Sequence, residues 1–129
     1  MQIKLIEIDD AIYERTIQEV EGSTADALWL TTKWHYKELT YEERKQFFLS
    51  VMYRLMKEGR LKLAFQGKFL EGTIEEQVAL YSERWPKNEA ELDEADFQFI
   101  TNPENENQLL LWPLCGFVWF YEDGFIEWT

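Results

Sequence analysis

Residues 40–59, TYEERKQFFLSVMYRLMKEG, decide how the middle of this 129-residue chain folds. Thr40 and Glu43 have the spacing of a capping box, in which a hydroxyl and a carboxylate satisfy the free amides that begin a helix. Apolar residues from Phe47 to Met56 then repeat with a period of about 3.6 residues, which is typical of a helix with one broad buried face. Gly59 suits the left-handed residue that commonly follows a helix. The stretch therefore predicts a long amphipathic helix.

Two shorter helices are expected before this one. Asp9 or Asp10 can cap the first, because an aspartate side chain accepts hydrogen bonds from first-turn amides, and Gly22 suits its end. The residues that follow Ser23 begin the second, whose apolar positions fit one helical face less cleanly. The apolar run ahead of Asp9 has two interpretations, a strand or a lead-in to the first helix.

The pattern changes after the long helix. Leu61–Phe65 alternates in the manner of a short strand. Thr73 and Glu76 then form a second capping box, which predicts another helix. Pro86 ends that helix, because proline restricts the residue before it to extended conformations.

The remainder of the chain predicts strands and connections. A tight turn at 122–124 would join the last two strands, with Gly124 supplying a positive φ. The interval 88–96 is expected to be an acidic connection, and 102–108 a polar loop. The strands are expected at 109–112, 117–121 and 125–128. Together these elements predict an α+β fold in a single domain, 1–129, with N-terminal and central helices packed on a C-terminal antiparallel sheet.

The charge of the chain limits the partners that it can bind. The formal net charge is −12, and residues 88–129 contain ten carboxylates but no lysine or arginine. Such a chain repels phosphate backbones and anionic membranes, so neither nucleic acid nor a membrane is expected as a direct partner. No apolar run approaches the ~20 residues of a membrane span, and the first ten residues lack the apolar stretch of a signal peptide. We therefore expect a cytoplasmic protein.

The sequence offers little material for catalysis. Cys115 is the one cysteine and lies in an apolar run, so we expect a small buried hydrophobe. His35 is the one histidine, and a nucleophile pair of Cys115 with His35 stays open because such partners need only meet in space. The paired carboxylates mostly stand at expected helix starts, where negative charge is favourable. We predict no catalytic residue, no metal site and no cofactor.

Aromatic residues are interleaved with the acids after residue 88. A disordered acidic tail would lack them, because disordered segments are poor in groups that bury apolar area. This region should therefore fold and present its carboxylates outward, which attracts a basic protein. Trp128 is the best candidate for an aromatic anchor. The residues expected to contact the partner are Asp93, Glu94, Asp96, Glu104, Glu106, Glu122, Asp123, Glu127 and Trp128.

A set of short motifs spans roughly residues 40–129. It comprises Phe47-Phe48, Leu55 with Glu58-Gly59-Arg60, Gly72-Thr73 with Glu76-Gln77, Trp85-Pro86, and Asp123-Gly124 with Trp128. With the small size and the acidic, aromatic-rich end, this pattern resembles the small immunity proteins of bacterial contact-dependent growth inhibition and polymorphic toxin systems. The resemblance implies a cytoplasmic protein that binds one cognate toxin domain, often a nuclease with a basic groove, and blocks it.

Two other interpretations remain open. The chain could be a cytoplasmic adaptor or a self-associating protein, in which the aromatic residues form a homodimer interface. It could instead be a carboxylate-based hydrolase, which requires two facing carboxylates in a cleft and a raised pKa on one of them.

Overall fold

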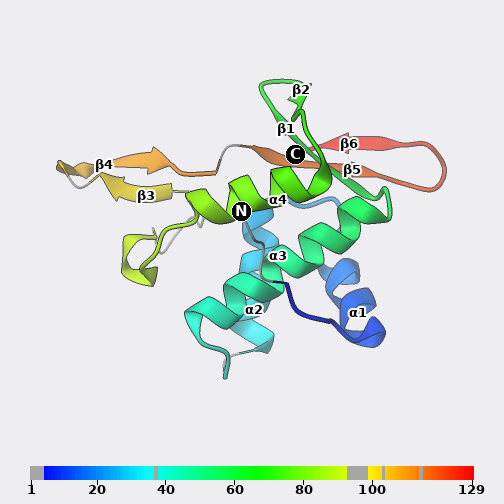
Figure 1. The fold of residues 1–129 in the computed structure, drawn as a ribbon, viewed down its shortest axis with the longest axis horizontal. Helices are drawn as coiled ribbons and strands as arrows, with labels where there is room; N and C mark the ends of the chain where they lie inside the picture. Colours follow the sequence, from blue (N-terminus) through cyan, green and yellow to red (C-terminus); the bar gives the residue numbers. More distant parts are fainter. Residues whose placement is uncertain (1–4, 37, 93–98, 103, 114) are drawn as a thin grey trace.

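The computed structural model describes residues 5–36, 38–92, 99–102, 104–113 and 115–129, which form helices first and complete a sheet at the end (Figure 1). The helices are α1 (Asp10–Val20), α2 (Ala25–His35), α3 (Tyr41–Lys57) and α4 (Ile74–Arg84), with a 3-10 turn, η1 (Glu89–Glu91). The strands are β1 (Leu61–Phe65), β2 (Lys68–Phe69), β3 (Phe99–Asn102), β4 (Asn105–Leu111), β5 (Gly116–Phe120) and β6 (Ile126–Trp128). The α+β fold that the sequence predicts is confirmed.

The helices begin where the sequence predicts. Asp9 caps α1, because its carboxylate accepts two first-turn amides. At α3 the Thr40 hydroxyl accepts the Glu43 amide at 3.1 Å, and the Glu43 carboxylate accepts the Thr40 amide at 2.9 Å. Thr73 and Glu76 repeat this capping box at α4. Local side-chain chemistry therefore fixes three of the helix starts.

The helix ends also follow local signals. Gly59 has a φ of 74° directly after α3, in the left-handed region that glycine occupies at low cost. α4 ends ahead of Pro86. α2 ends at His35, so its helical face stops before Leu39, although apolar spacing continues that far. The segment ahead of Asp9 is a lead-in to α1, because residues 5–8 form neither helix nor strand.

The larger sheet has four antiparallel strands in the order β2-β1-β5-β6. β1 pairs with β5, which places Leu63 opposite Phe117, and β5 pairs with β6, which places Val118 opposite Trp128. β1 and β2 precede α4, so the sheet joins the middle of the chain to its last strands. The turn between β5 and β6 contains Gly124 at a φ of 89°, as its sequence predicts.

The interval 102–108 corrects the prediction of a polar loop. β4 begins inside it and pairs with β3, which is not among the predicted strands. Ladder hydrogen bonds are made by the backbone, so polar residues such as Asn105 and Asn107 form a strand without the apolar alternation that burial produces. This second hairpin projects from the body at the end opposite the β5–β6 turn (Figure 1).

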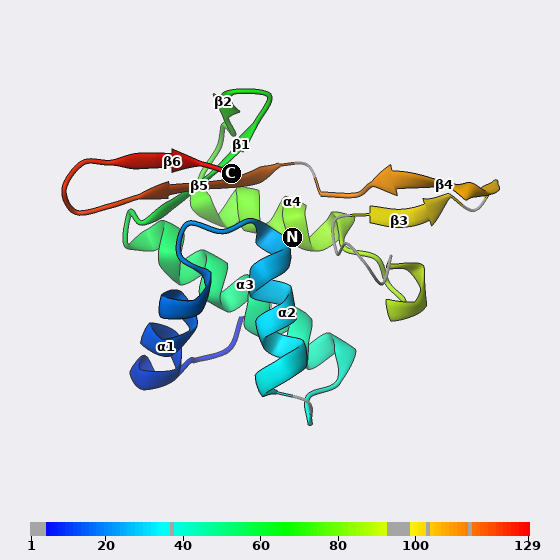
Figure 2. The same ribbon diagram turned by 180° about the vertical axis from the view of Figure 1, so that it is seen from behind.

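The two faces of the four-stranded sheet differ in burial. The helices lie on one side of the sheet in both views (Figures 1 and 2). The inner face, which points into the core, carries Leu61, Leu63, Phe117 and Trp119, and each is 1% exposed. The indole Nε1 of Trp119 donates to the carbonyl oxygen of Ser23 at 2.8 Å, so β5 is tied to the turn before α2.

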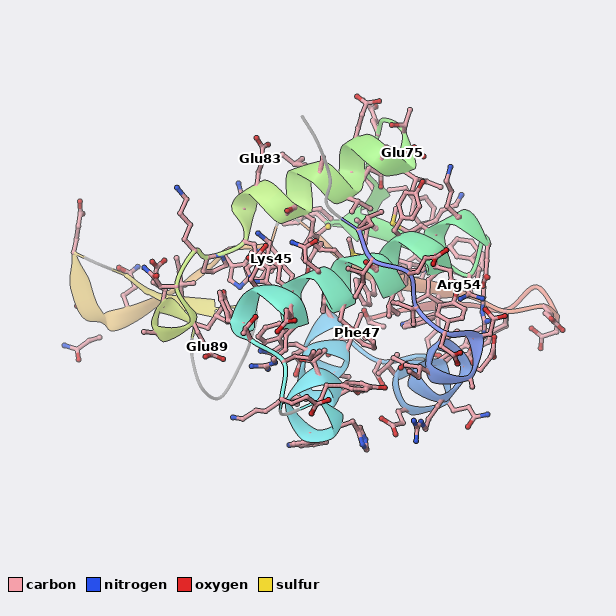
Figure 3. The ribbon with its side chains drawn as sticks, turned by 60° about the horizontal axis from the view of Figure 1, so that its bottom comes forward. Lys45, Phe47, Arg54, Glu75, Glu83 and Glu89 are labelled. Atoms are coloured by element: carbon pink, nitrogen blue, oxygen red, sulfur yellow. The ribbon has the colours of Figure 1, made fainter. Side chains whose placement is uncertain are left out.

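Arg44 fastens the start of α3 to its surroundings. Its guanidinium lies 4.0 Å from the ring centroid of Trp29, and its Nε donates to the Thr32 hydroxyl at 3.0 Å. One terminal nitrogen pairs with Glu89 at 2.8 Å, and Glu89 lies beside the N-terminal end of α3 (Figure 3). Within the described ranges, no helix is long and apolar enough to cross a membrane.

Candidate protein-binding cleft

A cleft of about 930 Å³ lies between α1, the turn after α3 and the β5–β6 hairpin. We call it the hairpin cleft. It is lined by Glu14, Glu21, Glu58, Gly59, Arg60, Phe120, Tyr121, Glu122, Asp123 and Phe125. Five carboxylates therefore line the cleft together with one guanidinium and three aromatic residues, of which Phe120 turns its ring to the other face of the sheet, toward Phe69.

Arg60 stands among the carboxylates on the helical side of the cleft. Its terminal nitrogens lie 3.6 Å from Glu14, 3.4 Å from Glu21 and 3.7 Å from Glu58. Arg60 thus faces three anions, of which Glu58 also pairs with Arg54 at 3.3 Å, and the hairpin adds Glu122. Both Glu122 and Asp123 are exposed, and neither forms an ion pair with a residue that the structure describes. The cleft consequently has an excess of negative charge.

The backbone of the β5–β6 hairpin holds the outer wall of the cleft in place. The amide of Phe120 donates to the carbonyl of Arg60 at 2.9 Å, which joins the hairpin to the turn after α3. The amide of Phe125 donates to the Asp123 carboxylate at 3.0 Å. The amide of Tyr121 donates to the carbonyl of Phe125 at 3.0 Å and closes the turn. The wall is therefore formed before any partner arrives.

Aromatic rings provide the apolar part of the cleft. The rings of Tyr121 and Phe125 lie 5.6 Å apart, and Phe125 is 57% exposed. The Tyr121 hydroxyl donates to the Glu127 carboxylate at 2.7 Å. Burial first, and then Glu127 and the carboxylates of Glu21 and Asp123, raise the pKa of Tyr121 to about 12. The hydroxyl therefore stays a neutral donor at physiological pH.

The structure brings together only some of the residues predicted to contact a partner. Glu122 and Asp123 both line the hairpin cleft. Glu104 is exposed at the β3–β4 turn, which lies at the opposite end of the molecule (Figure 1). Asp93, Glu94 and Asp96 lie outside the described residues, as does the side chain of Glu106. The predicted acids that the structure describes therefore do not form one continuous patch.

Glu127 and Trp128 point to opposite faces of the sheet. Glu127 pairs with Trp119 in the register, and its carboxylate binds Tyr121. Gly22, at a φ of 84°, packs against this pair, and a Cβ there would lie 2.9 Å from the Glu127 carboxylate. Trp128 lies on the outer face and is 50% exposed, and its ring stacks on Phe69 at 5.1 Å. Of the two, Trp128 is accessible to a partner.

Sequence reasoning missed the helical half of the cleft. Glu14 and Glu21 are seven residues apart, a spacing of about two helical turns that sets two positions on one face. That spacing is the one signal the sequence holds for their proximity. Nothing local connects them with Glu58 or with the β5–β6 turn, because only the folded sheet brings these segments together.

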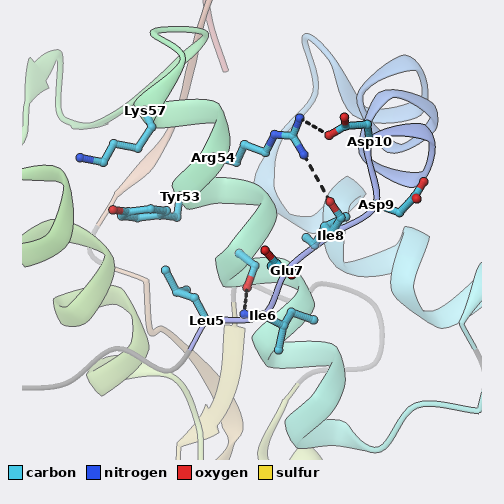
Figure 4. A pocket seen from close by; sticks show the side chains of 10 residues that line it. Leu5, Ile6, Glu7, Ile8, Asp9, Asp10, Tyr53, Arg54 and Lys57 are labelled. Carbon is cyan, nitrogen blue, oxygen red and sulfur yellow. Dashed lines mark hydrogen bonds and ion pairs between the residues drawn. The ribbon is translucent and has the colours of Figure 1, made fainter.

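A second cleft, of about 640 Å³, lies between the N-terminal lead-in and α3 (Figure 4). The amide of Ile6 donates to the Ser50 hydroxyl at 2.9 Å, and Arg54 donates to the carbonyl of Ile8 at 3.3 Å. Arg54 also pairs with Asp10 at 2.8 Å, and Lys57 pairs with a carboxylate of α4. Both cations of this cleft are therefore held in ion pairs, and the contacts of Ile6, Ile8 and Asp10 fasten the lead-in to α3.

Cys115 and His35, the two residues that the sequence offers for nucleophilic catalysis, lie in different settings. Cys115 is buried, which confirms the prediction, and burial raises the pKa of its thiol to about 12 in spite of nearby Arg84. His35 lies 3.1 Å from Glu19 at the surface. Among the residues that the structure describes, no group of three or more His, Cys, Asp or Glu side chains could hold a metal ion.

Several carboxyl groups have a displaced pKa, and the direction is downward. The amide and hydroxyl of Thr40 lower the pKa of Glu43, and those of Thr73 lower the pKa of Glu76. Hydrogen bonding from Lys57 lowers the pKa of Glu75 to about 2. These are the shifts of capping and ion-pairing carboxylates, whereas a general acid needs a raised pKa.

Comparison with known proteins relates the chain to others without an assigned activity. The family model "Protein of unknown function, DUF596" matches residues 56–129, which run from the last turn of α3 through the β5–β6 hairpin. A solved structure of an uncharacterized protein conserved in bacteria, from Neisseria meningitidis, is similar over 90% of this chain and 88% of that chain. The two share 24% identity with a TM-score of 0.61, a likeness that concerns the fold alone. No curated protein matches the chain.

Proposed function

We propose that this chain, which belongs to the DUF596 family of proteins of unknown function, is an immunity protein that binds and neutralises a cognate toxin domain. The binding site is the hairpin cleft, and the toxin surface that enters it is basic, as the substrate groove of a nuclease is. The protein acts in the bacterial cytoplasm, where a toxin of contact-dependent growth inhibition would otherwise reach its target.

The observation that carries this proposal is the composition of the hairpin cleft. Five carboxylates and the rings of Tyr121 and Phe125 meet there around Arg60, although they come from α1, the turn after α3 and the β5–β6 hairpin. A cleft of one charge sign focuses the electric field and raises the rate at which oppositely charged partners associate, by about tenfold or more at low salt. An excess of carboxylates therefore selects a cationic protein surface.

The aromatic rings of the cleft slow the dissociation of the complex. Most differences in affinity between related complexes lie in the dissociation rate, and partly exposed aromatic side chains are typical anchors. Phe125, at 57% exposed, presents a ring beside Glu122 and Asp123. A lysine or arginine of the toxin can contact that ring and a carboxylate at once, which combines cation–π attraction with an ion pair.

Co-expression tests the proposal. The C-terminal domain of the protein encoded by the gene immediately upstream is expressed in cells with and without this protein. We expect the domain alone to kill cells, and co-expression to restore growth and yield a complex that survives purification. A harmless domain, or killing that this protein does not relieve, would contradict the immunity function and favour an adaptor.

Two matched variants locate the binding site. Each neutralises four exposed or half-exposed carboxylates, so both change the net charge equally. The cleft variant carries Glu14→Gln, Glu21→Gln, Glu122→Gln and Asp123→Asn, and the control variant carries Glu7→Gln, Glu38→Gln, Glu71→Gln and Glu83→Gln. The asparagine keeps an oxygen that can accept the amide of Phe125. We expect the control variant to protect cells and the cleft variant to protect them poorly.

A further inference from the structure

The outer face of the four-stranded sheet is the other unusual surface of the molecule. The register sets alternate residues of β1, β5 and β6 on this face, away from the core residues between them. We call it the outer aromatic face, formed by Lys62, Ala64, Phe69, Val118, Phe120, Ile126 and Trp128. Phe69 is 41% exposed, Ile126 44% and Trp128 50%. Monomeric proteins rarely leave a contiguous apolar group of this kind open to water.

The rings of the outer aromatic face form one layer. Phe69 lies 5.9 Å from Phe120 and 5.1 Å from Trp128, measured between ring centroids. Val118 is 1% exposed although it lies on this face, so the layer already shields the strand beneath it. The rings thus hold one another in position, and a partner would meet a preformed surface.

Lys62 gives the outer aromatic face its charge. Its Nζ lies 5.1 Å from the centroid of Phe69 and 5.2 Å from that of Phe120. Lys62 forms no ion pair with a residue in the described part of the chain. Lys68 pairs with Phe65 in the register and so points to the opposite face, and residues 61–70 contain no carboxylate. This face is therefore locally cationic in a chain of net charge −12.

The tip of the β5–β6 hairpin has the complementary character. Glu122 and Asp123 are exposed there without an ion pair to a described residue, and the exposed ring of Phe125 lies beside them. An aromatic surface that holds a lysine can receive an aromatic tip that holds two carboxylates. Because both surfaces belong to one chain, a second copy of this chain carries the matching partner. Nucleic acid and anionic membranes fit less well, because the net charge repels them.

We propose that two copies of this chain associate through the outer aromatic face, each receiving the β5–β6 tip of the other. Reciprocal contacts of this kind form a closed, two-fold dimer. The contact buries the exposed side chains of Phe69, Ile126 and Trp128, and it sets Lys62 of one copy near Glu122 of its partner. This self-association goes beyond the immunity function but uses the same tip, because Glu122 and Asp123 also line the hairpin cleft. A tip seated on a second copy is therefore not free to bind a toxin.

Charge exchange between copies tests the dimer. Sedimentation velocity measures the mass of the full-length protein over a range of concentrations. We expect wild type to approach the mass of two copies, and Lys62→Glu or Glu122→Lys alone to weaken dimerisation by about tenfold or more, because like charges then oppose each other. An equimolar mixture of the two variants should dimerise again, since each contact then joins opposite charges.

Several results would overturn the dimer. A wild-type protein that stays monomeric at every concentration would contradict the dimer. This holds even if its outer aromatic face binds a different protein. Variants that dimerise as well as wild type, or a mixture that fails to recover, would also contradict it. Lys33→Glu makes the same charge change at an exposed position of α2 and should dimerise like wild type. Circular dichroism melts confirm that each variant is folded.

Discussion

The inner and outer faces of the four-stranded sheet use the same kind of residue for different purposes. Phe117 and Trp119 are 1% exposed against the helices, whereas Phe120 and Trp128 on the other face remain partly open. Trp119 and Phe120 are neighbours in sequence, and only the period-2 alternation of a strand separates them. Aromatic content alone therefore does not distinguish a core from a recognition surface, and the direction of each side chain does.

Removing a core ring should have the largest effect and tests the inner face. Trp119→Ala leaves a cavity and removes the hydrogen bond to the Ser23 carbonyl, so we expect a loss of about 3–5 kcal/mol in the free energy of unfolding. Urea denaturation of variant and wild type measures the difference. A loss below about 1 kcal/mol would mean that the inner face does not carry the stability of the sheet.

A second change tests how closely β6 packs against the helices. Gly22→Ala forces alanine to a φ of 84° and sets its Cβ 2.9 Å from the Glu127 carboxylate and from the Tyr121 hydroxyl. We expect a loss of about 2 kcal/mol, because the left-handed conformation is unfavourable for a residue with a Cβ. Gly67→Ala is the matched control for strain alone, since nothing lies within 4 Å of its added Cβ. Equal losses in thermal melts would show that the contact with Glu127 adds nothing.

The outer face should tolerate the same kind of truncation. Trp128→Ala removes a ring that is 50% exposed and stacks on Phe69, so we expect a loss of about 1 kcal/mol in the free energy of unfolding. The same urea titration that measures Trp119→Ala provides the value. If the two tryptophan variants lose similar stability, the distinction between the faces disappears.

The smallest effect concerns an ion pair on the helices, which belongs to neither face. The Nζ of Lys57 lies 2.8 Å from the Glu75 carboxylate, and its hydrogen bond is the largest cause of a lowered pKa there. Together with hydrogen bonds from the backbone and from Tyr53, it lowers the pKa of Glu75 to about 2 from an ordinary 4.5. Because the folded pKa is depressed, the pair stabilises the protein above about pH 4.5, and that contribution is lost as the pH falls toward 2. Glu75→Gln should lower the melting temperature slightly at pH 7 and leave it unchanged at pH 2. A difference that is independent of pH would argue against the ion pair.

Local signals in the sequence account for much of the helical layer. The capping boxes at Thr40 and Thr73 and the cap at Asp9 depend on residues within one turn, so a single sequence contains the whole interaction. The β5–β6 turn is equally local, with Gly124 in the left-handed region. The start of β4 was not predicted, because Asn105 pairs with Asn102 through backbone hydrogen bonds and residues 105–108 lack apolar alternation. β3 was not predicted either, although it sets Phe99 and Ile100 opposite Leu111 and Leu110.

The hairpin side of the candidate site could be predicted from the sequence, and the helical side could not. Glu122 and Asp123 stand in an acidic, aromatic segment, and their type alone suggests a binding role. Glu58 and Arg60 reach the same cleft because β1 pairs with β5, a contact between residues more than fifty positions apart. Glu127 was indistinguishable from these acids in the sequence, yet the alternation of β6 turns it inward to Tyr121. Long-range pairing and strand direction thus decide which carboxylates share the cleft.

The most direct test measures binding of the upstream toxin domain by calorimetry to wild type, the cleft variant and the control variant at several salt concentrations. A cleft that attracts a basic partner predicts at least about tenfold weaker binding and a shallower salt dependence for the cleft variant, because its charge pairs are lost. The control variant, with the same net charge, should bind like wild type. Equal affinities for the two variants would contradict the assignment of binding to the hairpin cleft.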